Sequence, residues 1–235
     1  MPSENTVSVV RTSRTRIIAA AGLFGALSIL LTTLSQALGL NFPVIPYLQF
    51  DFGEVAIILA FLFFGPVPAV FSAFVEFVTL MIIGQDVPVG PLFKIIAILS
   101  TIGGLWTGIA IAKRVSTEAK RGTILALSLV FGMIFRAAVM TVPNYLLVVG
   151  AFQGTVEYVT AGFRLLGISL TSSNALQLIL GFTAIFNCLQ LLLVFVIAYF
   201  LMRTPQLKHL LRSNRMAWFE SFGKSLASTK QQQQQ

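Results

Sequence analysis

Residues 52–84 read FGEVAIILAFLFFGPVPAVFSAFVEFVTLMIIG, an apolar stretch with one interruption at Gly65-Pro66-Val67-Pro68. The stretch is longer than one membrane crossing of about 20 residues, but each half is short for a crossing of its own. Because glycine and proline interrupt helices, it forms either one broken helix or a hairpin of two helices. The choice decides how often the chain crosses a membrane.

The composition of the whole chain favours a membrane protein. Hydrophobic residues make up 56% of the 235 positions and charged residues only 10%, far from the composition of soluble domains. The net charge of +8 lies in short groups beside apolar runs, which is typical of membrane topology signals and not of a nucleic-acid-binding face. We therefore expect an all-α integral membrane protein with one membrane domain, at residues 17–202.

Four further apolar runs are long enough to cross a bilayer as helices. They lie at residues 17–40, 91–112, 123–152 and 175–202. The run at 17–40 is too long for the apolar region of a signal peptide, so we interpret it as a retained first span.

Basic groups predict the orientation of these runs. They lie at residues 11–16, 113–121 and 203–230. Because Lys and Arg beside spans favour the cytoplasmic side, an even number of crossings must separate any two groups. Between the first two groups this holds only if residues 52–64 and 67–84 are two spans. The sequence thus predicts a bundle of six transmembrane helices with both termini cytoplasmic. Of the 16 Lys and Arg, the exceptions to this placement are Lys94, Arg136 and Arg164.

The segments outside the spans carry predictions of their own. Residues 1–16 and 203–235 are assigned to the cytoplasm, and the second of them begins as an amphipathic stretch and ends in glutamines expected to be disordered. Residues 41–51 hold two prolines and are assigned to an outer loop. A second outer loop is expected at 153–174, with a short helix at 163–168.

Polar residues within the spans are candidates for ligand binding because they are costly in lipid. Asn144 lies in the fifth span, and Thr183, Asn187 and Gln190 share one face of the sixth at i, i+4, i+7 spacing. Amides supply donors and acceptors without charge, which suits a neutral ligand rich in heteroatoms. Hydrogen bonding between helices is an equally good interpretation.

Charged residues within the spans are expected to pair. Glu76 and Lys94 should meet near the outer half of the bundle, either as an ion pair that joins two helices or as part of a ligand or proton path. Arg136 lies near the middle of the fifth span. Asp51 and Glu54 have the D-x-x-E spacing of a helix-capping box.

The sequence contains no arrangement of residues typical of catalysis. It lacks H-E-x-x-H and a phosphate-binding loop, and it has one histidine, His209, and one cysteine, Cys188. No enzyme activity, cofactor or metal site is expected. A stand-alone secondary transporter, coupled through Glu76 and Arg136, is an alternative function, although the internal repeats of such transporters are not evident.

Four segments together resemble the riboflavin-type S components of energy-coupling factor (ECF) transporters. They are Pro46-Tyr47-Leu48-Gln49-Phe50-Asp51-Phe52, Phe64-Gly65-Pro66, Met140-Thr141-Val142-Pro143-Asn144-Tyr145 and Phe186-Asn187-Cys188-Leu189-Gln190. The resemblance runs from about Ile17 to Met202. It implies a six-helix subunit of the cell membrane that captures a vitamin at its outer face. That subunit would dock on a transmembrane coupling subunit carrying two cytoplasmic ATPases.

The resemblance also implies roles for individual residues. Asn144 and Asn187 would hydrogen-bond a flavin, and the loop around Tyr47 to Phe50 would close the pocket. The expected substrate-binding residues are Gln36, Tyr47, Leu48, Phe50, Thr141, Asn144, Thr183, Asn187 and Gln190. Small residues of the first span would contact the coupling subunit, although such surfaces more commonly serve packing within a chain. These residues are Ala21, Gly22, Gly25 and Ala26.

Two departures from the family pattern affect the expected ligand. Gln190 stands where members often have lysine, and Glu76 and Lys94 reverse the usual order of the basic and acidic residues. Riboflavin or a related flavin, as a transported ligand, is the expected substrate, and another vitamin is the alternative. If Glu76→Lys with Lys94→Glu folded no better than either single variant, that result would argue against a reversed ion pair.

Overall fold

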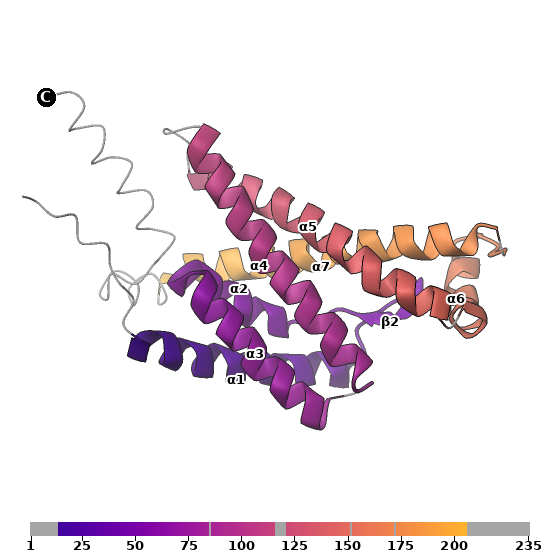
Figure 1. Ribbon diagram of the computed structural model, residues 1–235, viewed down its shortest axis with the longest axis horizontal. Coiled ribbons are helices and arrows are strands. Elements are labelled where there is room, and N and C mark those ends of the chain that lie inside the picture. Colours follow the sequence, from indigo (N-terminus) through magenta and orange to yellow (C-terminus); the bar gives the residue numbers. More distant parts are fainter. Residues whose placement is uncertain (1–13, 85, 116–120, 151, 172, 206–235) are drawn as a thin grey trace, which may run out of the picture.

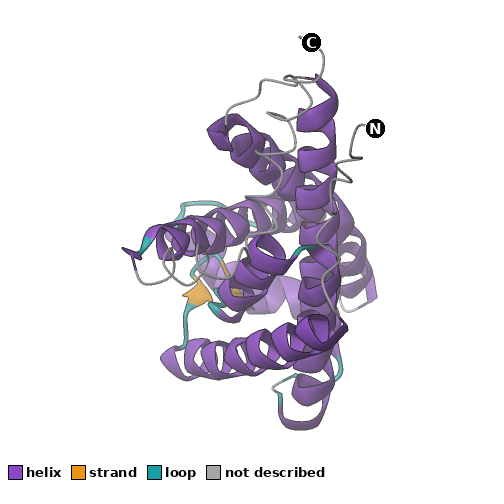
Figure 2. Cartoon of the chain, turned by 90° about the vertical axis from the view of Figure 1, so that its left-hand side faces the viewer, coloured by secondary structure: helices purple, strands orange, loops and turns teal. Residues whose placement is uncertain are grey.

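The computed structural model describes residues 14–84, 86–115, 121–150, 152–171 and 173–205. Its elements are α1 (Arg14–Leu38), β1 (Asn41–Phe42), β2 (Ile45–Gln49), α2 (Gly53–Phe64), α3 (Pro66–Ile83), α4 (Val89–Val115), α5 (Arg121–Gly150), α6 (Phe152–Leu165) and α7 (Ala175–Arg203). The described part of the chain is helical almost throughout, with the two short strands as the exception (Figure 2). The expected amphipathic tail and glutamine run lie outside the described residues.

Five of the described helices are long and apolar enough to cross a membrane, namely α1, α3, α4, α5 and α7. The prediction of a helical, multi-pass membrane protein is therefore confirmed. Helix α2 is also apolar but has only 12 residues, or about 18 Å of helix, against a hydrocarbon core of about 30 Å. Six crossings and cytoplasmic termini stay predictions.

The glycine-proline interruption forms a turn between two helices. Gly65 has a φ of 94°, a conformation that favours glycine, and its N–H donates to the Phe61 carbonyl oxygen at 2.9 Å. Pro66 begins α3, where a missing backbone N–H costs nothing. Helices α2 and α3 then pack against each other. The stretch is thus a hairpin, as the topology argument requires.

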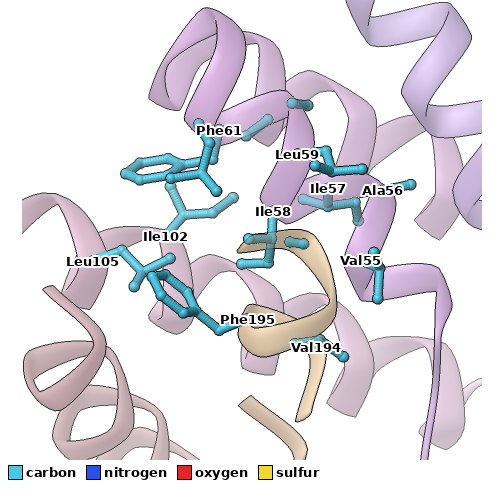
Figure 3. Close-up of a cluster of buried hydrophobic side chains, with 14 of the residues drawn as sticks. Val55, Ala56, Ile57, Ile58, Leu59, Phe61, Ile102, Leu105, Val194 and Phe195 are labelled. Carbon is cyan, nitrogen blue, oxygen red and sulfur yellow. The ribbon is translucent and has the colours of Figure 1, made fainter. Parts of the chain in front are cut away.

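Helix α2 is the centre of the bundle. Every residue from Gly53 to Phe63 is buried, and the helix contacts α1, α3, α4 and α7. Figure 3 shows side chains of α2, among them Ile58 and Phe61, beside Ile102 of α4 and Phe195 of α7. A helix that is apolar on all sides belongs inside a protein. Its fixed position determines where the acidic residues at its N-terminus lie.

Two segments predicted as outer loops have regular structure, so those predictions were wrong in detail. Within 41–51, β1 and β2 form an antiparallel hairpin that buries Ile45 and Leu48. Within 153–174, helix α6 covers 152–165 instead of 163–168, because Val159 and Phe163 give it a buried face at i, i+4 spacing. Figure 1 places α6 and β2 at the same end of the bundle.

Helices α4 and α5 approach closely because two glycines of α4 face α5. A Cβ atom at Gly104 would lie 2.7 Å from the Phe131 carbonyl oxygen, and one at Gly108 would lie 2.5 Å from Ser128 Cα. At Gly103, one position earlier, a Cβ would meet nothing within 4 Å. The two kinds of glycine on one helix offer a matched test of this packing.

We expect Gly108→Ala to lower the melting temperature of the purified protein and Gly103→Ala to leave it unchanged or raise it. Both substitutions gain the same helix propensity of about 1 kcal/mol. At Gly108 the new methyl group meets backbone atoms, and overpacking of this kind costs about 1–3 kcal/mol. Thermal unfolding in detergent measures the difference. Equal melting temperatures would contradict the close packing of α4 on α5.

Candidate functional site

A cavity of about 610 Å³ lies at the end of the bundle that carries the β-hairpin. Its lining comes from both strands and from all seven helices of the described part of the chain, and its volume is typical of small-molecule sites. Four of the expected substrate-binding residues line it, namely Gln36, Tyr47, Leu48 and Asn187. The other five are not among the described residues that line the cavity. They are Phe50, Thr141, Asn144, Thr183 and Gln190.

The β-hairpin is held over the bundle by α6. A Cβ atom at Gly162 of α6 would lie 2.7 Å from the Pro43 carbonyl oxygen, so only glycine allows this approach of helix to hairpin. Beside it, Phe163 is fully buried and packs edge-on against Phe182 of α7 at 5.1 Å between ring centroids. Tyr158 of the same helix lines the cavity. Sequence reasoning missed this role because it assigned the segment to a loop.

Three phenylalanine rings form an aromatic cluster between the hairpin and α7. The Phe186 ring centroid lies 5.5 Å from that of Phe42 and 5.1 Å from that of Phe50, and the last two are 6.3 Å apart. Phe186 also lines the cavity. Aromatic side chains in this arrangement offer both faces and edges to a flat ring system.

Three buried polar atoms of the hairpin, α5 and α7 have no hydrogen-bond partner in the described part of the chain. They are Tyr47 Oη, Asn144 Oδ1 and Thr183 Oγ1. Buried polar atoms in native proteins are nearly always hydrogen-bonded. Burial raises the pKa of Tyr47, an effect that the nearby Thr183 hydroxyl opposes, so the phenol stays neutral near pH 7 and can donate. All three residues are among those expected to bind substrate.

Asn187 uses part of its hydrogen-bonding capacity within the protein. Its Oδ1 accepts a hydrogen bond from Arg136 Nε at 3.0 Å, and its Nδ2 donates to the Thr183 carbonyl oxygen at 2.9 Å. The amide is therefore fixed in one orientation. One N–H and one lone pair remain for a ligand in the cavity.

Gln190 uses both ends of its amide within the protein, and its expected role in substrate binding stays a prediction. Its Nε2 donates to the Asp51 carbonyl oxygen at 2.7 Å, and its Oε1 accepts from the Asp51 N–H at 3.3 Å. Both ends of the amide thus bind the backbone just before α2. Gln190 joins α7 to the segment between the hairpin and α2, which fixes the floor of the site.

Arg136 forms a buried ion pair with Glu54. Its Nη2 donates to Glu54 Oε1 at 2.8 Å and its Nη1 to Oε2, which makes the pair bidentate. Nη1 also donates to Thr101 Oγ1 at 3.2 Å. Both side chains are almost fully buried. The predicted capping box is therefore only half formed. Asp51 Oδ1 accepts a hydrogen bond from the Gly53 N–H at the start of α2 at 2.7 Å, whereas the carboxylate of Glu54 binds Arg136 of α5 and does not cap α2.

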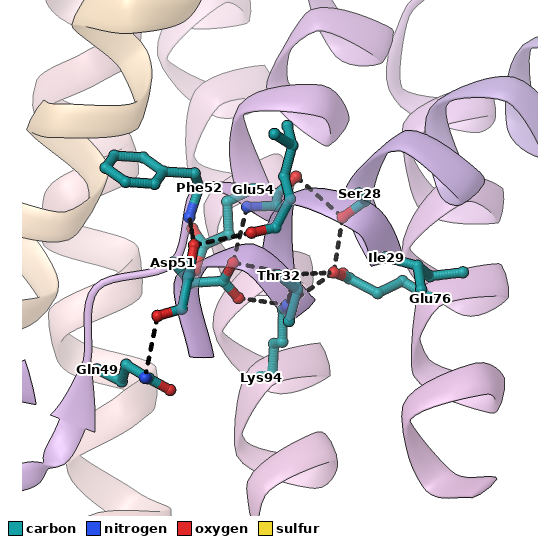
Figure 4. A network of polar contacts seen from close by, with 12 residues as sticks. Ser28, Ile29, Thr32, Gln49, Asp51, Phe52, Glu54, Glu76 and Lys94 are labelled. Atoms are coloured by element: carbon teal, nitrogen blue, oxygen red, sulfur yellow. Dashed lines mark hydrogen bonds and ion pairs between the residues drawn. The ribbon is translucent and has the colours of Figure 1, made fainter. Parts of the chain in front are cut away.

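Lys94 joins two acidic residues near the N-terminus of α2. Its Nζ donates to Glu76 Oε1 at 2.6 Å and forms an ion pair with Asp51 (Figure 4). The expected pair of Glu76 and Lys94 is confirmed. Thr32 and Ser28 of α1 extend the network, since each hydroxyl lies within 2.8 Å of the same Glu76 oxygen. Sequence reasoning missed Asp51 as a second partner.

We expect Lys94→Met to lower the stability to unfolding by about 3 kcal/mol, because the buried carboxylate of Glu76 and the partly buried carboxylate of Asp51 lose their cation. The charge-swap variant, Glu76→Lys with Lys94→Glu, should recover only part of this loss. Its new carboxylate at position 94 would face Asp51, so adding Asp51→Asn should recover more. Melting temperatures of the variants measure this order. Full recovery by the swap alone would contradict the contact between Lys94 and Asp51.

The small residues of α1 divide between two surfaces. Ala21 and Gly25 are buried, and a Cβ atom at Gly25 would lie 2.8 Å from Val75 Cβ of α3. Gly22 and Ala26 are exposed, and a Cβ at Gly22 would meet nothing within 4 Å. One small-residue pair thus serves packing within the chain, and the other is open to a partner helix or to lipid.

Comparisons with known proteins give one informative result. No protein-family model and no curated protein matches the chain. Among solved structures, the S component of a bacterial ECF transporter is 19% identical, with a TM-score of 0.61, over 85% of this chain and 99% of that chain. A likeness at this level of identity establishes a common fold. The chain therefore has the helical membrane fold of that S component.

Proposed function

We propose that this protein is the substrate-binding membrane subunit of an ECF-type vitamin transporter and that it binds riboflavin or a related flavin. The observation that carries the proposal is the cavity lined by Tyr47, Phe186 and Asn187, where Tyr47 Oη has no hydrogen-bond partner in the described part of the chain and Asn187 has one N–H to spare beside an aromatic ring. A flat heterocycle with polar edges supplies partners for such atoms and packs against aromatic rings. The likeness in fold to an S component supports the assignment.

Binding would occur at the outer face of the membrane. The ring system would lie against Phe186 and the hairpin, and the remaining N–H of Asn187 would donate to a carbonyl oxygen or ring nitrogen of the ligand. Closure of the hairpin and α6 over the ligand would exclude water and strengthen these hydrogen bonds. The chain's own part is then capture and release of the vitamin, with no chemical step.

Transport would require a transmembrane coupling subunit in the cell membrane that carries two cytoplasmic ATPase subunits. The exposed pair Gly22 and Ala26 supports a docking surface for the coupling subunit on α1. The alternative of a stand-alone secondary transporter has less support. Its proposed coupling residues, Glu76 and Arg136, both pair with a charged residue of another helix.

A flavin titration tests the proposed ligand. The purified protein should quench riboflavin fluorescence until about one flavin per chain is bound, and protein expressed with flavin available should be yellow. Absence of flavin binding, together with uptake into proteoliposomes that an ion gradient alone drives, would refute the proposal.

The docking surface predicts a separation of function. We expect Gly22→Leu to leave flavin binding unchanged and to reduce co-purification with the coupling subunit, since its side chain would enter the space of the partner helix. Gly25→Leu should instead lower the melting temperature, because it meets Val75 within the chain. If Gly22→Leu co-purified as well as the unmodified protein, docking through this face would be excluded.

A further inference from the structure

Acidic residues outnumber basic residues around the cavity. Among the described residues that line it, three are acidic, Asp51, Glu54 and Asp86, and two are basic, Lys94 and Arg136. Glu76 adds a further negative charge behind the lining, because it shares Lys94 with Asp51. The described surroundings of the cavity therefore carry more acid than base.

Lys94 has no donor left for a ligand. An ammonium group has three N–H donors. Those of Lys94 are directed to Thr32 Oγ1, Glu76 Oε1 and Asp51. A ligand anion could bind this cation only by displacing the Thr32 hydroxyl, which would place it beside the carboxylates of Glu76 and Asp51, or by displacing a carboxylate, which would then be left unpaired.

Arg136 also has few donors to spare. Of the five N–H donors of a guanidinium, four are used by Glu54, Asn187 and Thr101. The bidentate contact with Glu54 neutralises its charge, and only 3% of the residue is exposed. One N–H remains, which suits a neutral acceptor such as a carbonyl oxygen better than a second anion.

The connection between α3 and α4 adds an acidic residue at a more exposed part of the cavity. Asp86 lies there, is exposed, and has a φ of 53°, a conformation that aspartate and asparagine tolerate. No lining residue in the described part of the chain offers an unpaired positive charge to balance it. An anion would thus meet excess negative charge both at the floor and at this more exposed part.

We infer that this cavity selects its ligand by charge: it admits neutral or cationic compounds and rejects anionic ones, such as phosphate esters and carboxylates. The inference rests on the proposed function insofar as this cavity is the site of vitamin capture. For a flavin site, it means that the protein binds riboflavin and discriminates against flavin mononucleotide, its phosphate ester.

Titrations with the two flavins test the inference on the purified full chain. Flavin mononucleotide carries about −1.5 to −2 charges at pH 7 and should bind at least about tenfold more weakly than riboflavin. Raising the salt concentration should narrow the difference by screening. Equal or tighter binding of the phosphate ester at low salt would overturn the inference.

Substitution of a single acidic residue should change the ratio of the affinities for flavin mononucleotide and riboflavin. A residue that only supports the fold would not change this ratio. Asn at position 51 can still accept from the Gly53 N–H, as Asp51 does at 2.7 Å, but frees one donor of Lys94. Asp51→Asn should therefore improve binding of flavin mononucleotide relative to riboflavin. Asp86→Asn, which keeps the backbone conformation, should act in the same direction if Asp51→Asn fails to fold.

A matched control is Glu157→Gln, since Glu157 is an exposed acid of α6 outside the cavity lining. It should leave the ratio of the two affinities unchanged. If neither Asp51→Asn nor Asp86→Asn changed the ratio, or if the control changed it equally, charge selection by the cavity would be overturned.

A failure of the flavin proposal can be distinguished from a failure of charge selection. If neither flavin binds, thermal stabilisation by millimolar thiamine (a cation), pyridoxine (neutral), biotin and pantothenate (both anions) tests the charge rule alone. Stabilisation by thiamine or pyridoxine but not by the anions would support the inference. Stabilisation by an anion, or by none of the four compounds, would overturn it.

Discussion

Replacement of Arg136 by methionine is expected to lower the free energy of unfolding by about 3–5 kcal/mol, which is a large share of the stability of a typical domain. The variant leaves the Glu54 carboxylate almost fully buried without its cation, and it also removes a donor from Asn187. Thermal or denaturant unfolding in detergent measures the loss. A loss below about 1 kcal/mol would contradict a buried, bidentate ion pair.

The control for this variant removes both charges. Glu54→Leu together with Arg136→Met should recover most of the stability, because an apolar pair of similar volume replaces a buried ion pair at little or no cost. Flavin binding should not recover in parallel, since Asn187 would still lack the guanidinium that fixes its amide. If the double variant were as unstable as the single one, unpaired charge would not explain the loss.

Asn144→Leu should weaken flavin binding by roughly 30-fold, about 2 kcal/mol, while the free energy of unfolding of the ligand-free protein changes by less than about 1 kcal/mol. In the ligand-free protein the substitution removes Asn144 Oδ1, which is buried without a partner, and it loses one hydrogen bond, which Nδ2 donates to the Met140 carbonyl oxygen at 2.8 Å. The two effects on stability oppose each other. In the complex, the same removal leaves a polar group of the ligand unsatisfied. Thr183→Val should act likewise, because its Oγ1 is also unpartnered.

Thr141→Val provides the control in the same helix as Asn144. Thr141 was expected to bind substrate, but its hydroxyl already donates to the Ala137 carbonyl oxygen at 2.8 Å. Asn144 Oδ1, by contrast, has no partner in the described part of the chain, and neither residue is among those that line the cavity. We expect less than about a threefold change in affinity, or roughly 0.6 kcal/mol. Titrations and melting curves of the three variants measure these effects. If Asn144→Leu changed the flavin affinity no more than Thr141→Val does, the role of Asn144 would be refuted.

Much of the fold could be predicted because its signals are local. Length and hydropathy identify the long helices, and Gly65-Pro66 marks a turn whatever surrounds it. Helix α6 was predicted in the wrong place because its buried face depends on contact with the hairpin, which no local pattern reveals. The β-hairpin was missed for a different reason: its strands are very short, so no local pattern marks them.

The partners of buried charges were harder to predict, because they are distant in sequence. Glu54 and Arg136 are 82 residues apart, and only the packing of α2 against its neighbours brings them together. The local spacing of Asp51 and Glu54 instead suggested a cap. By contrast, Glu76 and Lys94 are 18 residues apart on consecutive helices, and their pairing could be predicted.

The small residues of α1 show a related limit. Helical periodicity predicts which residues share a face, but it does not tell which face meets α3. Only the contact of Gly25 with Val75 separates the packed pair from the exposed one.

The short length of α2 has a consequence for biosynthesis. A helix of 12 residues, about 18 Å long, is too short to leave the translocon as an independent span, so it should enter the membrane together with α3. Its Glu54 then remains without Arg136 until the ribosome has synthesised another 82 residues. Nascent chains that end after α4 should therefore be unable to reach the final packing and should be degraded, whereas chains that end after α5 should persist.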